Sequence, residues 1–259
     1  MRLYLAGLEA FAGNENNNYK LYLNNDTKVL TSFYYCKDIM IQDLIRQVGV
    51  DNILVDSGAF TFRMHGLKGE DIDSYTKRYI EFINKYNIKY FFEMDIDMCK
   101  EDLNKVKQLR GLIEKDTGKK TIPVWHMTRG INEWKELVDR YDYIAIGDIA
   151  EQLDKQFIRT LKQMIKYANR KGVKVHGLGY NRKDLLDYDF YSCDATTWQG
   201  GKYGNIWYWD KNINRPRHTK SDTANRRLRA DKQGEVARHN YKVWYHYQKY
   251  LLDKGFWHE

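Results

Sequence analysis

The chain has 259 residues, 42% of them hydrophobic, which is enough for one large domain with a sizeable core. No stretch approaches about 18 consecutive apolar residues, and the first residues lack the basic and long apolar regions of a secretory signal. We therefore expect a cytoplasmic protein with neither a membrane-spanning segment nor a membrane partner.

The formal net charge is +8, which favours a polyanionic partner, above all nucleic acid. Basic residues gather between Lys211 and Arg238, where three carboxylates oppose them. Such a cluster would neutralise phosphates and make binding salt-dependent, whereas the alternative is that it serves simple solubility. The residues predicted to contact nucleic acid are Arg215, Arg217, Lys220, Arg226, Arg227 and Arg229.

The three cysteines, Cys36, Cys99 and Cys193, are widely spaced and odd in number. The sequence contains no CxxC pair and no other zinc-ligand spacing. We therefore expect no metal, no cofactor and free thiols in a reducing compartment.

Eight short runs of the chain are typical of β-strands. Several are rich in β-branched or aromatic residues and lack strict alternation, as expected for strands that are buried on both faces. The predicted strands span residues 2–7, 29–35, 52–56, 89–95, 121–126, 143–147, 173–177 and 190–194.

Helical patterns separate most of these strands. The segment after Asp71 repeats apolar residues at a spacing near 3.6 with charges opposite. A later segment ends at Lys171-Gly172, which is a helix C-cap signal. The predicted helices span residues 39–48, 72–86, 101–116, 132–140, 154–171 and 182–187.

Eight strands with intervening helices in about 195 residues indicate an α/β fold of the irregular (β/α)8 TIM-barrel type. The alternative is an open doubly wound sheet, but no glycine-rich nucleotide fingerprint follows the first strand. We predict a barrel catalytic domain over residues 1–197. A basic, aromatic-rich C-terminal helical extension over residues 198–259, with its helix at 232–253, is expected to pack on the barrel.

Three predicted strands end at or near a carboxylate, namely Asp56, Asp95 and Asp194. The carboxyl ends of barrel strands converge on one mouth, and acidic residues are seldom buried unless they are paired or functional. The alternatives are a helix cap for Asp56 and a structural aspartate bonded to backbone amides for Asp194. Glu93, Asp95 and Asp97 alternate, so we predict that they face one side of an extended segment, with a salt bridge or a solvated strand end as the alternative for Glu93 and Asp97.

Other strand ends carry a histidine or a glycine. His126 follows Pro123-Val124-Trp125, and taken alone such a histidine is more often a satisfied hydrogen-bond partner than a catalytic base. Gly147 and Gly177 would let a ligand approach the backbone, and a plain turn is the equally common alternative. The turn Asp56-Ser57-Gly58 is predicted to point backbone N–H groups into the mouth.

The short motifs at these strand ends follow one another in an order that is found in a known family. It resembles that of the tRNA-guanine transglycosylase family, and most of all the family's shorter relatives that insert 7-deazaguanines into DNA in phages and bacterial modification islands. The similarity covers residues 52–197, and residues 56–60 are its most specific part. The pieces are Asp56-Ser57-Gly58-Ala59-Phe60, Glu93-Met94-Asp95, Pro123-Val124-Trp125-His126, Ala145-Ile146-Gly147, His176-Gly177-Leu178-Gly179 and Cys193-Asp194.

The resemblance implies a role for each matching residue. Asp194 would be the nucleophile that attacks C1′ and expels guanine, and Asp56 the acid/base group for the departing and incoming bases. Asp95 would accept hydrogen bonds from the purine edge. The other residues that the resemblance places around the base are Ser57, Phe60, His126 (where the family usually has Gln), Gly147, His176 and Gly177.

The implied reaction is exchange of guanine in DNA for a free 7-deazaguanine base through a covalent Asp-nucleotide intermediate. The implied partners are DNA and an accessory protein that opens the duplex, in the host cytoplasm if the chain is phage-encoded. The cysteine-rich zinc site of the tRNA enzymes is missing. Two alternatives stay open: a zinc-free tRNA-guanine transglycosylase, and a catalytically inactive barrel that binds nucleic acid.

Overall fold

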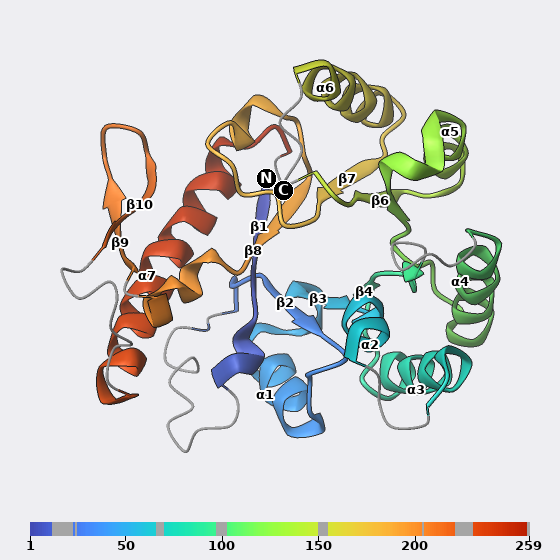
Figure 1. Ribbon diagram of the computed structural model, residues 1–259, viewed down its shortest axis with the longest axis horizontal. Coiled ribbons are helices and arrows are strands. Elements are labelled where there is room, and N and C mark those ends of the chain that lie inside the picture. Colours follow the sequence, from blue (N-terminus) through green and yellow to red (C-terminus); the bar gives the residue numbers. More distant parts are fainter. Residues whose placement is uncertain are drawn as a thin grey trace.

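The computed structural model describes residues 1–11, 23, 25–65, 70–96, 103–149, 155–203, 205–220 and 230–257. Eight parallel strands form one curled sheet in the order β4-β3-β2-β1-β8-β7-β6-β5, with helices around its outside (Figure 1). The strands are β1 (Arg2–Ala6), β2 (Val29–Ser32), β3 (Ile53–Asp56), β4 (Tyr90–Phe91), β5 (Val124–Trp125), β6 (Tyr143–Ile146), β7 (Lys174–Gly177) and β8 (Ser192–Ala195).

The two end strands of this order meet just beyond β4. Phe92 forms a parallel bridge with Ile122; the Ile122 N–H donates to the Phe91 carbonyl (2.8 Å) and the Glu93 N–H donates to the Ile122 carbonyl (3.2 Å). Strand order follows chain order around the curl, unlike a doubly wound sheet, whose order reverses at a switch point. The fold is therefore α/β with a TIM-barrel-like parallel sheet, as predicted.

Five of the six predicted helices are present, and the sixth prediction, residues 182–187, is wrong. That connection holds a 3-10 turn at Leu185–Asp187, and the rings of Tyr180, Tyr188 and Phe190 on either side of it pack against one another. The short helix α2 was not predicted. The helices are α1 (Asp38–Val48), α2 (Ala59–His65), α3 (Ile72–Lys85), α4 (Leu103–Thr117), α5 (Gly130–Arg140), α6 (Lys155–Arg170) and α7 (Ala230–Lys254).

Alternate residues of the strands fill the interior of the barrel, and their sequence neighbours pack outward against the helices. A residue two positions beyond an interior one therefore also points inward. This rule places Ser32, Asp56, His126 and Gly147 directly above the apolar interior, at the carboxyl ends of their strands. The interior residues are Tyr4, Ala6, Leu30, Leu54, Phe92, Ile122, Val124, Tyr143 and Ala145.

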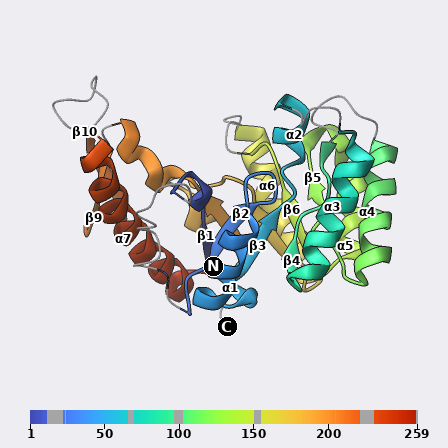
Figure 2. The same ribbon diagram turned by 90° about the horizontal axis from the view of Figure 1, so that it is seen from below.

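The C-terminal part of the chain contains a hairpin that the sequence analysis did not predict. It consists of β9 (Asn205–Asp210) and β10 (Arg215–Lys220), and Figures 1 and 2 both show it outside α7, on the side away from α3 and α4. Trp207 packs edge-on against Trp244, and Trp209 packs against His246. The aromatic run therefore attaches the hairpin to α7.

Helix α7 in turn is joined to the first two strands. The side-chain amide of Gln248 donates to the carbonyls of Leu3 (2.6 Å) and Lys28 (2.8 Å) and accepts from the Lys28 N–H (3.1 Å). The amino group of Met1 donates to the Leu251 carbonyl (3.1 Å). These contacts pack the extension on the barrel, while the domain boundary at residue 197 stays a prediction. Over the described ranges, no helix has the length and apolar character needed to cross a membrane.

Replacement of Gln248 by Leu tests this junction. The variant keeps the volume of the side chain but removes hydrogen bonds to buried backbone groups, so we expect the free energy of unfolding to fall by about 1–3 kcal/mol. Urea unfolding followed by circular dichroism measures the change. Glu235→Gln, on an exposed position of α7, is the control and should change stability by less than about 0.5 kcal/mol. Equal stability of the two variants would contradict the assignment.

Candidate active site

Asp56 is the last residue of β3 and lies beside Ser32 of β2. The turn that follows is tightly held: the Tyr75 hydroxyl donates to the carbonyl of the buried Ser57 (2.8 Å), and Gly58 has a φ of 69°. A side chain at Gly58 would collide with Tyr34, 2.6 Å from its Cβ. The Asp-Ser-Gly turn therefore fixes where the Asp56 carboxylate sits.

The pKa of the Asp56 carboxyl group is strongly raised. Burial raises its pKa from 3.8 to about 7, the negative charges of Asp95 and then of Asp194 raise it as well, and the Ser32 hydroxyl and the Gly58 N–H only partly oppose this. The three aspartates are far apart in the sequence, yet the charges of two of them act on the third. The structure thus brings the three predicted carboxylates into one electrostatic environment.

Asp194 lies on β8 between β1 and β7 and is 8% exposed. One of its oxygens, Oδ1, accepts hydrogen bonds from the Gly179 N–H (2.7 Å) and from His176 Nε2 (3.2 Å). Both contacts go to the same oxygen, so they fix the orientation of the carboxylate. This geometry is what a positioned nucleophile requires.

His176 does not occupy the position that the resemblance implied. Its ring is completely buried beneath Asp194, with Nδ1 2.6 Å from Ser192 Oγ, so it has no free face on which a base can stack. The prediction that His176 contacts the base is therefore wrong. Phe60, its proposed counterpart, is 55% exposed on α2 and keeps a free ring.

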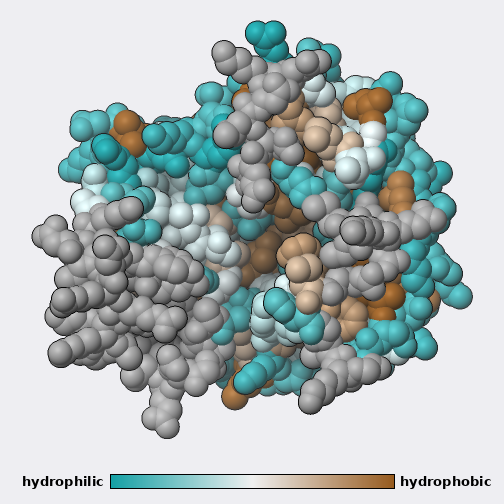
Figure 3. Space-filling model, in the orientation of Figure 1, coloured by the Kyte–Doolittle hydropathy of each residue, from teal (hydrophilic) through white to brown (hydrophobic). Residues whose placement is uncertain are grey.

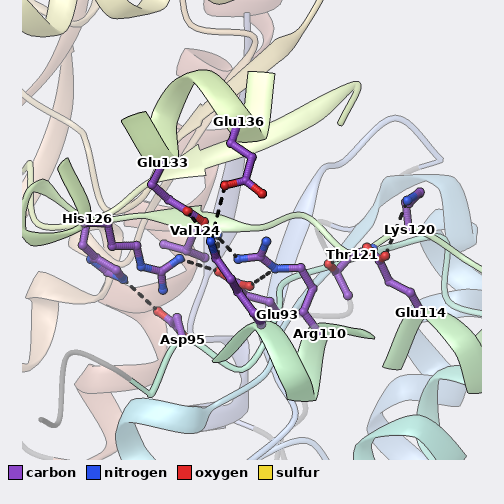
Figure 4. Close-up of polar contacts among 12 residues, drawn as sticks. Glu93, Asp95, Arg110, Glu114, Lys120, Thr121, Val124, His126, Glu133 and Glu136 are labelled. Carbon is purple, nitrogen blue, oxygen red and sulfur yellow. Dashed lines mark hydrogen bonds and ion pairs between the residues drawn. The ribbon is translucent and has the colours of Figure 1, made fainter. Parts of the chain in front are cut away.

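His126 connects two carboxylates. Its Nδ1 lies 3.0 Å from Asp148 Oδ2. Its Nε2 forms an ion pair with Asp95 Oδ2 at 3.6 Å, which is somewhat long for a hydrogen bond (Figure 4). Burial lowers the pKa of His126, but its contacts with the carboxylates of Asp148 and Asp95 outweigh burial and raise that pKa to about 9. The side chain is 3% exposed. His126 therefore acts as a buried cation behind Asp95 and does not present a ring nitrogen to the opening, as direct base contact would need.

Asp95 itself keeps some exposed surface, with 16% of its side chain accessible. Burial raises its pKa, and the hydrogen bond and the charge of His126 partly oppose that rise. Asp95 thus has an accessible carboxylate held in place from behind, which suits an acceptor for the N–H groups of a ligand.

The two predicted glycines make room for side chains of the site. A Cβ at Gly147 would lie 2.6 Å from Nδ1 of His126, and a Cβ at Gly177 would lie 3.1 Å from the ring of Phe190. Gly147 is therefore needed for the His126 ring to reach Asp95. Close approach of a ligand to either glycine stays a prediction.

The prediction that Glu93, Asp95 and Asp97 share one side is wrong for Glu93. Glu93 is fully buried and points outward to α4, where Oε2 binds Arg110 Nε (2.5 Å), while Oε1 binds Arg129 Nη1 (2.9 Å) and the Val124 N–H (2.8 Å) (Figure 4). The extended chain ends there, because Ile96 N–H turns back to the Met94 carbonyl. Asp95 lies beyond the strand and faces His126 instead. Asp97 lies outside the described residues.

The predicted nucleic-acid residues are only partly described. Arg217 is exposed and pairs with Asp210 (3.1 Å), and Arg215 is partly buried at the start of β10. Lys220 ends β10, and Arg226, Arg227 and Arg229 lie outside the described residues. Figure 3 shows apolar surface in a recess near the middle of the face seen in Figure 1.

Two polar residues beside the predicted carboxylates, Ser32 and Ser192, were not predicted from the sequence. Each is a common residue type without a motif around it. The alternation of the strands could have indicated them, because residues two positions apart on a strand point to the same side. Ser32 is two positions beyond the interior residue Leu30, and Ser192 is two positions before Asp194.

Comparison with known proteins gives no family for this chain. No model of a known protein family matches it, and a search of the curated proteins finds no similar sequence. In the part of the chain that the structure describes, no three or more His, Cys, Asp or Glu side chains are grouped so that they could hold a metal ion.

The raised pKa of Asp56 predicts a stability change in Asp56→Asn. A folded-state pKa of about 7 above an ordinary value of 3.8 means that the wild-type fold loses stability as pH rises between these values. The neutral amide avoids this loss. A pKa difference of about three, at about 1.36 kcal/mol per pKa unit, corresponds to a loss of up to about 4 kcal/mol. Asp56→Asn should therefore be increasingly more stable than wild type from pH 5 to about pH 8 in thermal unfolding. Asp142→Asn, at an exposed position, should show no such trend.

Replacement of Glu93 is expected to lower the stability of the fold, whereas Asp56→Asn is expected to raise it. Glu93→Gln removes the fully buried carboxylate that pairs with the guanidinium groups of Arg110 and Arg129, so we expect a loss of about 3–5 kcal/mol in chemical denaturation. Glu136→Gln, whose side chain is 39% exposed and paired with Arg140, should cost less than about 1 kcal/mol. If Glu93→Gln costs no more than Glu136→Gln, the buried cluster does not support the fold.

Proposed function

We propose that this chain is a guanine transglycosylase that exchanges guanine in DNA for a 7-deazaguanine base, with a covalent intermediate on Asp194. The proposal rests mainly on one observation: the Asp56 carboxyl group feels the charges of both Asp95 and Asp194 and has a pKa near neutrality. Three carboxylates with different environments at one rim suit a reaction that needs a nucleophile, an acid/base group and a base-recognition group.

In the first half of the proposed reaction, Asp194 Oδ2 attacks C1′ of the target nucleotide. The bond from C1′ to N9 breaks, its electron pair goes to guanine, and guanine takes a proton from Asp56. Displacement at C1′ passes through an oxocarbenium-like state, which the adjacent carboxylate stabilises and then traps as an ester. Two carboxylates divide these roles in retaining glycosidases in the same way.

The second half reverses the proton transfer. Asp56, now ionised, accepts the N9 proton of the incoming 7-deazaguanine. N9 bonds to C1′, the ester bond to Oδ2 breaks, and its electron pair returns to Asp194. A pKa of about 7 lets Asp56 act in both directions near neutral pH.

Base recognition falls to Asp95 in this proposal. Its accessible carboxylate would accept the ring N–H and the exocyclic amine of the purine edge, which guanine and 7-deazaguanines share. His126 and Asp148 hold that carboxylate from behind. The same pocket would therefore accept both the outgoing and the incoming base.

DNA is the proposed polymer because of the basic C-terminal segment and the motif resemblance. A base inside a duplex must leave its stack to reach a barrel rim, at a cost of a few kcal/mol. The exposed ring of Phe60 on α2 is available for stacking on a base. Trp207 and Trp209 are used in packing on α7, so they are not part of this surface.

The test is base exchange measured by mass spectrometry of nucleosides. The protein is incubated with 7-cyano- or 7-aminomethyl-7-deazaguanine and with duplex DNA, single-stranded DNA or tRNA. We expect the modified nucleoside in DNA and a protein–DNA adduct that survives denaturation. Modification of tRNA alone would identify the alternative polymer, and binding without base release on every substrate would favour an inactive barrel.

Asp194→Asn should abolish exchange and the adduct while the variant stays folded. The matched control is Asp187→Asn, which removes the same charge from an exposed position on the connection that precedes β8. The control should keep wild-type rates. Full activity in Asp194→Asn would remove the nucleophile assignment.

A further inference from the structure

A line of polar groups crosses the otherwise apolar interior of the barrel and ends at Asp194. The Tyr143 hydroxyl lies 2.5 Å from Ser192 Oγ, Ser192 Oγ lies 2.6 Å from His176 Nδ1, and His176 Nε2 lies 3.2 Å from Asp194 Oδ1. His176 has no exposed surface and Tyr143 is 9% exposed. Such buried polar groups are costly unless each of them finds a partner.

The hydrogen bonds of this line can be satisfied in one consistent direction. An ionised Asp194 only accepts, so His176 Nε2 carries the proton of that bond. Nδ1 of a neutral imidazole then accepts from the Ser192 hydroxyl, whose oxygen accepts from Tyr143. Burial raises the pKa of Tyr143 well above its ordinary value, so its hydroxyl keeps the proton that it donates. Every donor of the line then has an acceptor.

We propose that His176 is a positioning residue for Asp194, and that Ser192 and Tyr143 hold its imidazole in the tautomer with the proton on Nε2. This inference rests on the proposed role of Asp194 as nucleophile. His176 and the Gly179 N–H both bind Oδ1, so they fix the orientation of the carboxylate. The rings of Phe92 and Tyr4 beside His176, with centroids 5.3 and 6.2 Å away, restrict its movement.

The arrangement contributes most when Asp194 leaves C1′. In the ester, Oδ1 is the carbonyl oxygen and Oδ2 is bonded to C1′. As the incoming base displaces the ester, the electron pair of the breaking bond returns to the carboxylate. The two N–H groups already aimed at Oδ1 stabilise the returning charge without reorganisation. Resolution of the covalent intermediate should therefore depend on His176 more than base binding does.

The tautomer is measured first, without any substrate. Histidine labelled with nitrogen-15 is introduced into the full chain, and the ring nitrogens are recorded by long-range proton–nitrogen NMR. His176→Gln identifies the His176 signals by their loss. We expect Nε2 protonated and Nδ1 bare in wild type, and a mixture of tautomers in Ser192→Ala. A proton on Nδ1 and a bare Nε2 in wild type would overturn the proposal whatever the protein catalyses.

The second measurement is kinetic. His176→Leu should slow resolution of the trapped intermediate about 100-fold or more, with KM for the base nearly unchanged, as for loss of one anion-stabilising donor. Ser192→Ala should slow it roughly 10-fold, the lower end of what loss of an orienting partner costs. His176→Gln, whose amide can still donate to Oδ1, should recover part of the rate. An active His176→Leu variant with wild-type resolution would overturn the positioning role.

Cys193→Ala is the matched control for Ser192→Ala. It removes one buried atom from the next residue of β8, whose side chain lies among the residues packed outside the barrel. It should leave both the tautomer and the rates unchanged. If wild-type protein exchanges no base on any polymer, the proposed function fails, but the NMR result still decides whether His176 donates to Asp194.

Discussion

The constraint on which the site depends is the cost of holding three carboxylates at one buried rim. Parallel strands bring Asp56, Asp95 and Asp194 together because their ends meet, and burial then penalises every negative charge. The structure offsets this cost unequally. Asp95 faces the His126 cation, and Asp194 receives two N–H groups on one oxygen. For Asp56, burial and the charges of Asp95 and Asp194 outweigh the hydrogen bonds from Ser32 and Gly58, so its pKa is near neutrality.

Because the three carboxylates have different hydrogen-bond partners and neighbouring charges, they suit different chemical roles. A carboxylate with fixed donors on one oxygen is suited to nucleophilic attack by the other, whereas one with a pKa near the working pH is suited to proton transfer. The two histidines have comparable positions in this scheme. His126 behind Asp95 and His176 behind Asp194 are both buried, and each connects its aspartate to a further polar residue. The resemblance in sequence implied that both histidines contact a base, but in the structure both rings are buried.

Much of the framework could be predicted from sequence, and the failures have physical reasons. The ends of β3, β6 and β7 were predicted to within one residue because these buried runs stop at a carboxylate or a glycine, which are local signals. Strand β4, in contrast, ends at Phe91 and does not reach its predicted end at Asp95. The outward turn of Glu93 depends on Arg110 and Arg129, which are distant in sequence, so alternation alone gave the wrong side. The hairpin β9–β10 was missed because its aromatic residues pack on α7, a contact that no local pattern records. Segment 182–187 has helical composition, but it holds a 3-10 turn between aromatic rings that pack against one another.

The coupling of the carboxylates also bears on how the proposed reaction would change direction. The charge of Asp194 is one of the causes that raise the pKa of Asp56. When Asp194 becomes an ester, that charge disappears, so the pKa of Asp56 falls just after it has given its proton to guanine. The ionised form is then favoured, which is the form needed to accept the N9 proton of the incoming base. When Asp194 is released, its charge returns and the pKa of Asp56 rises again, which favours the protonated acid for the next turnover.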